Sequence, residues 1–172
     1  MTPELEQHIR EKYPLIFSQR CEMSINDGWF DIIDILCGNI QNRIDNVIRQ
    51  REYTIEWNKN VNDPDFEWTA AFVEREEREV PELVEQVVAK QIKEKFGTLR
   101  FYYDGGDDYI RGLEAMAASM TSRVCEQCGC PGTSRSTKKQ RWVLVLCDKH
   151  AEEQGYIAVS YTHLTLPTKR IV

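Results

Sequence analysis

Residues 26–52 read NDGWFDIIDILCGNIQNRIDNVIRQRE, and apolar side chains recur in this stretch every three or four positions. This spacing puts the apolar residues on one face of an α-helix. The stretch therefore predicts a long helix packed against a core, with Asn26 or Asp27 as its N-terminal cap. The repeat consists of Phe30, Ile33, Leu36, Cys37, Ile40, Ile44, Val47 and Ile48. Cys37 belongs to the apolar face, where an unpaired cysteine behaves as a small buried hydrophobe.

The segments on either side of this helix predict shorter elements. Residues 3–13 have the pattern of a short helix, because Pro3 suits a first helical position and Pro14 ends the pattern. Residues 53–80 alternate aromatic and polar residues around the turn sequence NDPD. We expect two short strands joined by a loop there, followed by a solvated charged end in the sequence EREERE.

Residues 80–96 are compatible with two structures. Apolar residues recur every four positions, at Val84, Val88, Ile92 and Phe96. This repeat suits a helix closed by Gly97, whereas the β-branched residues suit a strand that turns back at KFGT. Residues 99–103 are simpler, since Leu99, Phe101 and Tyr103 alternate with Arg100 and Tyr102. Such alternation is typical of a strand with one buried face.

The sequence DGGDD at 104–108 ends this strand and offers an aspartate cap to a helix over 109–124. The apolar stripe of this helix consists of Ile110, Leu113, Met116, Met120 and Val124. We expect the stripe to pack in the core rather than to line a cofactor site.

Four of the six cysteines lie between residues 125 and 147, in the sequences VCEQCGC (124–130) and LCDKH (146–150). The spacing Cys-x2-Cys-x18-Cys-x2-His predicts a structural Zn²⁺ ion. Its predicted ligands are Cys125, Cys128, Cys147 and His150. Four protein ligands leave no position for water, so the metal would stabilise rather than catalyse. Cys130 could replace Cys128, although the spacing favours Cys128, and four unliganded residues in a small flap are the alternative to a metal.

These elements predict an α+β fold in which helices pack on a small antiparallel sheet, followed by a treble-clef or ribbon-like zinc finger. The expected domains are a core over 1–120 and a finger over 121–157. Residues 158–172 are expected to be a non-native tail, because VSYTHLTLPTKRIV resembles the translated sequencing-adapter read-through that ends many metagenomic reading frames. That resemblance implies an environmental or viral source.

The composition limits the classes of function. The 172-residue chain has a formal net charge of −6, which argues against a protein that mainly grips phosphate backbones. The N-terminal sequence is charged rather than signal-like, and no long apolar run is present, so we expect a soluble protein of the bacterial cytoplasm with no membrane partner. The sequence also lacks phosphate-loop, nucleophile-elbow and paired-histidine motifs, so we expect no enzyme activity.

Four motifs together resemble a widespread family of uncharacterised accessory proteins from tailed bacteriophages. They are DGWFDIIDILCGNIQ, QIKEKFGTLRFYYDGGDD, CEQCGCPG and LCDKHA, in this order. The resemblance covers most of residues 10–155 and implies a phage protein made inside a bacterium. It implies no known activity and no catalytic residue.

Cationic and aromatic residues occur together in the predicted strand region. Arg100, Tyr102, Lys95 and Phe96, with Trp29 nearby, are the candidate ligand-binding residues. A guanidinium can bind phosphate while an aromatic ring stacks on a base, so these residues suit a nucleotide-like ligand. The alternative is that Arg100 pairs with a glutamate and Tyr102 caps the core.

Three functional hypotheses follow from these observations. The first is a phage counter-defence protein that sequesters a host nucleotide-derived immune signal, which is compatible with a homo-oligomer whose subunits share the pocket. The second is a zinc-finger adaptor that binds and inhibits a host defence protein. The third, which the acidic charge favours least, is nucleic-acid binding through the basic loop SRSTKKQR at 134–141. A solvated hairpin tip is the alternative for that loop.

Overall fold

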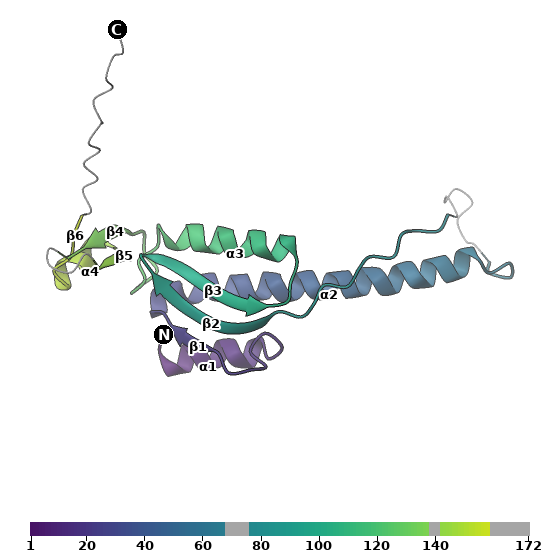
Figure 1. Ribbon diagram of the computed structural model, residues 1–172, viewed down its shortest axis with the longest axis horizontal. Coiled ribbons are helices and arrows are strands. Elements are labelled where there is room, and N and C mark those ends of the chain that lie inside the picture. Colours follow the sequence, from purple (N-terminus) through teal and green to yellow (C-terminus); the bar gives the residue numbers. More distant parts are fainter. Residues whose placement is uncertain (68–75, 138–141, 159–172) are drawn as a thin grey trace, which may run out of the picture.

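Helix α2 (Phe30–Val61) is the longest element and follows directly on the 3-10 turn η1 (Asp27–Trp29). The computed structural model describes residues 1–67, 76–137 and 142–158, and in it α2 passes behind a small sheet and extends beyond it (Figure 1). The predicted apolar face is buried over the first half of the helix, at Ile33, Leu36, Cys37, Ile40, Ile44 and Val47. Neither Asn26 nor Asp27 provides a side-chain cap, because Asn26 donates to Glu126 and Asp27 accepts from the backbone N–H of Thr2.

The first strand predicted after this stretch is wrong, because α2 continues to Val61. The Arg78 guanidinium of the returning chain lies 3.8 Å from the Trp57 ring centroid. Asn58 also exchanges two side-chain hydrogen bonds with the backbone of Arg78. Arg78, from a segment that is distant in sequence, thus covers Trp57 on the helix. The local sequence pattern did not indicate this contact. The second expected strand falls mostly on residues 68–75, outside the described residues.

Strands β2 (Val88–Lys95) and β3 (Thr98–Asp104) form an antiparallel hairpin, and β1 (Glu22–Ser24) pairs with β2 in parallel. The strand alternative for residues 80–96 is therefore correct from Val88 onward, and the helix alternative is wrong. A four-residue repeat is also a multiple of the two-residue period of a strand, so the same pattern suits one strand face. The predicted α+β fold is confirmed, with β1 as a parallel addition to the sheet.

One face of the sheet packs against α2 and α3 (Asp108–Thr121), and the buried side chains on it are Met23, Ile92, Leu99 and Phe101. Helix α1 (Pro3–Lys12), which confirms the predicted short helix, packs beside the start of α2. The opposite face of the sheet has no helix of the described residues over it (Figure 1). We call the surface made by Lys93, Lys95, Arg100 and Tyr102 on that side the open face.

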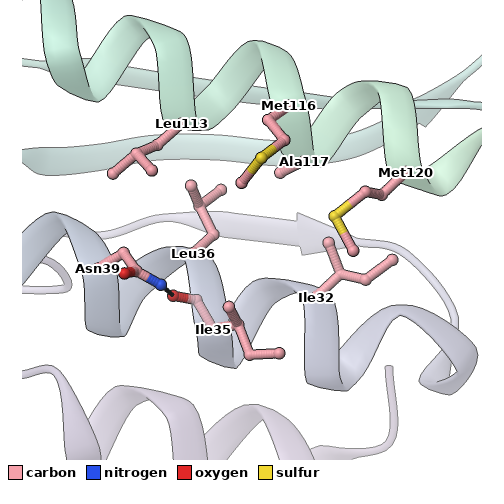
Figure 2. Close-up of a pocket in the computed structure, with 8 residues that line it drawn as sticks. All are labelled: Ile32, Ile35, Leu36, Asn39, Leu113, Met116, Ala117 and Met120. Carbon is pink, nitrogen blue, oxygen red and sulfur yellow. Dashed lines mark hydrogen bonds between the residues drawn. The ribbon is translucent and has the colours of Figure 1, made fainter.

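The apolar stripe predicted for α3 is buried only in part. Ile110, Ala117 and Thr121 are buried, whereas Met116 and Met120 are about half exposed. Figure 2 shows the two methionines at a groove between α3 and α2, together with Ile32, Ile35, Leu36, Asn39, Leu113 and Ala117. The expectation that the whole stripe packs in the core is therefore wrong. The three buried residues are seven and four positions apart, so they form a narrow line along one side of the helix. The two methionines belong to the wider apolar stripe and lie beside this buried line.

The C-terminal elements are β4 (Thr133–Ser136), β5 (Val143–Leu146), α4 (Asp148–Glu153) and β6 (Ile157–Ala158). The three strands form a second antiparallel sheet with the order β5-β4-β6. A tight turn that carries the first two cysteines, a hairpin and a helix thus follow one another, which is the order of elements in a treble-clef-like finger. Part of the predicted basic loop, residues 138–141, lies outside the described residues, as do residues 159–172 of the predicted tail.

No helix in the described ranges combines the length and the apolar composition that crossing a bilayer requires. The predicted location in a bacterial cytoplasm stays a prediction.

The cap of α3 can be tested by mutation. The Asp107 carboxylate accepts a hydrogen bond from Ile110 N at 3.0 Å and forms an ion pair with Arg43 at 2.9 Å. Asp107→Ala is expected to lower the free energy of unfolding by about 1–2 kcal/mol, because it removes the cap. Asp107→Asn keeps a cap and loses only the charge, so its loss should be smaller. Urea denaturation measures both, and equal losses would show that the cap contributes nothing.

Candidate metal centre and candidate ligand face

The four predicted metal ligands converge on one point at the end of the molecule. Their ligand atoms all lie within 4.8 Å of one another. The Cys128 and Cys147 sulfurs are 3.9 Å apart, and His150 Nδ1 lies 3.4 Å from Cys125 Sγ and 3.3 Å from Cys147 Sγ. A tetrahedral ion with metal–sulfur bonds of about 2.3 Å separates its ligand atoms by roughly 3.5–3.8 Å. The cluster therefore has the dimensions of a four-coordinate metal site.

The first ligand pair lies in a tight turn that we call the knuckle, residues 125–129. Gly129 adopts a φ of 75°, a conformation that side chains other than glycine rarely adopt. This lets Gly129 N donate to Cys125 O at 2.9 Å and closes the turn. Both cysteine sulfurs thereby point to the same side, as the two-residue spacing predicted.

The second ligand pair lies where β5 meets α4. Cys147 directly follows the strand and occupies the N-cap position of the helix, and His150 lies in its first turn. Ala151 N donates to Cys147 O at 2.9 Å, which fixes the two side chains on the same side of the helix start. The free ring nitrogen, His150 Nε2, has the Glu153 carboxylate 3.9 Å away, in the place where ligating histidines commonly have a carboxylate.

The surroundings shift the pKa values of the Cys125 and Cys147 thiols in opposite directions. Burial raises the pKa of Cys125, while backbone N–H groups of Cys147, Gln127 and Cys128 act against that rise. The backbone N–H of His150, at the start of α4, lowers the pKa of Cys147. Backbone donors directed at sulfur stabilise thiolates, which are the form that binds a metal.

Cys130 lies beside the cluster next to Cys128, whereas Cys37 lies apart from it in the core. Cys130 is exposed and follows the knuckle, and its carbonyl accepts from Cys125 N at 2.8 Å. Cys128 rather than Cys130 supplies the sulfur near the other ligands, as the spacing favoured. Cys37 is fully buried in the core, and burial raises the pKa of its thiol strongly, so it behaves as the predicted small hydrophobe.

Trp29 does not line a ligand site, which corrects its prediction as a ligand-binding residue. Its ring is fully buried, and Nε1 donates to the Val124 carbonyl at 3.0 Å, just before the knuckle. Gly28 N donates to Glu126 O at 2.9 Å beside it. A Cβ on Gly28 would lie 2.2 Å from the Cys125 carbonyl oxygen, so only glycine fits there. Gly28 and Trp29 thus dock the finger onto the core.

Glu126 is buried inside this docking contact. Its Oε1 accepts from Asn26 Nδ2 at 2.5 Å, whereas its Oε2 has no partner among the described residues. Burial raises the pKa of Glu126 to about 7, with Asn26 opposing the rise and the Glu94 charge adding to it. No signal in the sequence pointed to this residue, since an isolated glutamate between two cysteines has the pattern of a surface residue.

The other candidate ligand-binding residues lie at the surface. Tyr102 is 46% exposed, with the Lys93 ammonium 5.1 Å from its ring centroid. Arg100 donates to the Leu99 carbonyl, and no carboxylate of the described residues lies within 4 Å of its guanidinium. Lys95 and Phe96 lie at the hairpin tip, with the ammonium 5.5 Å from the ring centroid. The Arg100 charge nevertheless acts on Glu114 of α3, where it opposes the rise in pKa that burial causes, so the alternative of an Arg100–glutamate interaction stays open beyond 4 Å.

Comparison with known proteins found no family model that matches the chain, and no curated protein or solved structure that is similar to it. The resemblance to a bacteriophage family accordingly stays a prediction.

The metal site predicts different effects for two neighbouring cysteines. Cys128→Ser is expected to lose the bound metal and unfold the finger, because it removes one of four ligands. Cys130→Ser, the matched control, should retain one equivalent of metal per chain. Elemental analysis and far-UV circular dichroism before and after chelator treatment measure both. Metal retained by Cys128→Ser and lost from Cys130→Ser would assign the ligand to Cys130 instead.

The buried Glu126 predicts a pH-dependent stability difference. Its folded pKa of about 7 exceeds its ordinary value of 4.5, so the folded protein keeps a proton that the unfolded chain releases between these values. Stability should fall as the pH rises through this range and stay constant above it. Relative to Glu126→Gln, the wild type should therefore lose up to about 3 kcal/mol between pH 4.5 and 7.

Urea denaturation of both proteins across this range measures the difference. The cysteine ligands titrate equally in wild type and variant, so their contribution cancels. A difference that does not change with pH would contradict the assignment of a buried, proton-binding carboxyl.

Proposed function

We propose that this protein is a zinc-stabilised binding protein that captures an anionic, nucleotide-like ligand on the open face without catalysis. Three cysteine sulfurs and one imidazole nitrogen are a common ligand set of structural zinc. With four protein ligands, the ion has no position for a water molecule or a substrate. When bound, zinc would hold the knuckle and α4 together and so stabilise a finger whose own core is small.

The observation that carries the proposal is that cationic side chains and an exposed aromatic ring occur together on the open face. Lys93, Lys95 and Arg100 form no ion pair within 4 Å among the described residues, and the Lys93 ammonium lies 5.1 Å from the centroid of the exposed Tyr102 ring. Cations without anionic partners favour a phosphate, and an exposed tyrosine ring offers a base a stacking surface. No helix of the described residues lies over this side of the β2–β3 hairpin (Figure 1).

The acidic composition is compatible with this proposal because the negative charge is distributed unevenly. Five glutamates of the segment 76–85 follow the outer half of α2, away from the β2–β3 turn (Figure 1). The open face itself carries cations. An anion is therefore attracted to one end of the molecule and repelled from the other.

The resemblance to phage proteins supplies the biological context of the proposal. A binding protein made during infection would counter host defence by sequestering a nucleotide-derived immune signal. One face of a sheet offers a ligand a single wall, whereas small ligands favour concave sites. A second subunit that faces the first would supply the missing wall, which is compatible with a homo-oligomer.

The groove between α2 and α3 favours a second function, that of an adaptor for a host protein. It is lined by Ile32, Ile35, Leu36, Leu113, Met116, Ala117 and Met120, with Asn39 at its edge (Figure 2). Flexible methionines at an exposed apolar groove are typical of surfaces that accept the apolar face of a helix. An adaptor would use this groove and leave the open face unoccupied.

Arg100→Ala tests the first function directly. The wild type is expected to bind a cyclic dinucleotide or ADP-ribose, and the variant should bind roughly tenfold or more weakly because a charged hydrogen bond to phosphate is lost. Arg111→Ala removes the same charge from an exposed site on α3 and should bind as the wild type does. Thermal shift and titration calorimetry measure these affinities.

A wild type that no nucleotide stabilises would overturn the nucleotide proposal. The adaptor would take its place if a bacterial protein is retained by the wild type and not by Met116→Asp. Equal weakening by Arg100→Ala and Arg111→Ala would indicate a general effect of charge rather than a site.

A further inference from the structure

Phe96 occupies a position that costs folding free energy. Phe96 and Gly97 form the two-residue turn between β2 and β3, and both have positive φ, 55° and 75°, as a type I′ turn requires. Asparagine, aspartate or glycine normally fills the first position, because a Cβ is strained in this conformation. The Phe96 ring is also 71% exposed, so the strain is not repaid by burial. A strained, exposed aromatic residue points to a role in binding.

A second exposed ring lies opposite Phe96, on the finger. Trp142 precedes β5 and is 59% exposed. Between the hairpin tip and the finger is a cleft of about 250 Å³, which we call the aromatic cleft, lined by Glu94, Lys95, Phe96, Trp142 and Val143. Its walls come from two segments that are distant in sequence. Sequence reasoning missed Trp142, whose only signal was an aromatic residue directly after a basic run.

The finger holds the two walls at a fixed separation. A Cβ on Gly97 would lie 3.1 Å from a methyl group of Val145, so the hairpin tip and β5 are in close contact. The Glu94 carboxylate accepts from Gly97 N at 2.5 Å and is therefore engaged by the turn. Among the described residues that line the cleft, Lys95 supplies the cationic group, with its ammonium 5.5 Å from the Phe96 ring centroid. These features describe a site for a planar ring that carries an anionic group.

We propose that the aromatic cleft holds a nucleobase, and that the ligand is a single-stranded oligonucleotide of two or more bases. This inference rests on the proposed function of the open face. Tyr102 lies four residues along β3 from Thr98 at the turn, a separation of roughly 13 Å. One mononucleotide cannot reach both rings, whereas a strand with its phosphates on Lys93, Lys95 and Arg100 can. Aromatic residues on an open sheet stack successive bases of single strands in this way.

The test compares thymidine monophosphate with fluorescein-labelled hexathymidylate by fluorescence anisotropy and competition at low ionic strength. The wild type should bind hexathymidylate more tightly. Phe96→Gly and Trp142→Ala should each weaken hexathymidylate roughly 5- to 150-fold, the loss expected for one stacked base, and leave the monophosphate unchanged. Trp142→Phe should largely restore binding. Phe96→Gly relieves the strained turn, so thermal unfolding should occur at an equal or higher temperature.

Salt dependence separates stacking from charge. Arg100→Ala should reduce the slope of log affinity against log salt concentration for hexathymidylate by about one, the value for one lost phosphate contact. Phe96→Gly should leave this slope unchanged. Unchanged hexathymidylate binding by both cleft variants, with loss on Arg100→Ala, would overturn the cleft inference and leave the proposed function standing. Failure of the wild type to bind either probe or any nucleotide would overturn both.

Discussion

The contact between the turn at 26–29 and the knuckle at 125–129 connects the two halves of this protein. Gly28 and Trp29 meet the knuckle through backbone and indole hydrogen bonds, and no side chain larger than hydrogen fits at Gly28. A metal ion held by the four candidate ligands would fix the knuckle, and the knuckle in turn contacts the start of α2. The metal centre and the long helix are therefore parts of one structural unit, although they lie about a hundred residues apart in the chain.

Under the proposed function, the candidate metal centre would have an indirect role in recognition. The finger brings Trp142 close to the hairpin tip, and the hairpin carries the open face. A chain without the metal would keep its three body helices, whose core is large, and lose the second wall of the aromatic cleft. Under the proposed function, binding and metal content would thus be coupled through position alone, without contact between the ion and a ligand.

Several elements were predictable because their causes are local. The apolar face of the first half of α2, the alternation in β3 and the aspartate cap of α3 depend on residues within a few positions of one another. The metal ligands were predictable for the same reason, since two pairs with two-residue gaps can bind one ion wherever the chain brings them together. Residues 80–96 were not decided by their own pattern, because a repeat of four suits both a helix and a strand.

The sequence by itself determined the α+β class, the positions of α1, α3, β3 and the first half of α2, and the four candidate ligands. Tertiary structure alone decided that α2 continues to Val61, because Arg78 covers Trp57 from a distant segment. It also decided that Trp29 is buried against the knuckle while Phe96 and Trp142 are exposed at one cleft. The physical reason is that the burial of a side chain depends on which distant segments pack against it. The spacing of residues along the chain reports only on local structure.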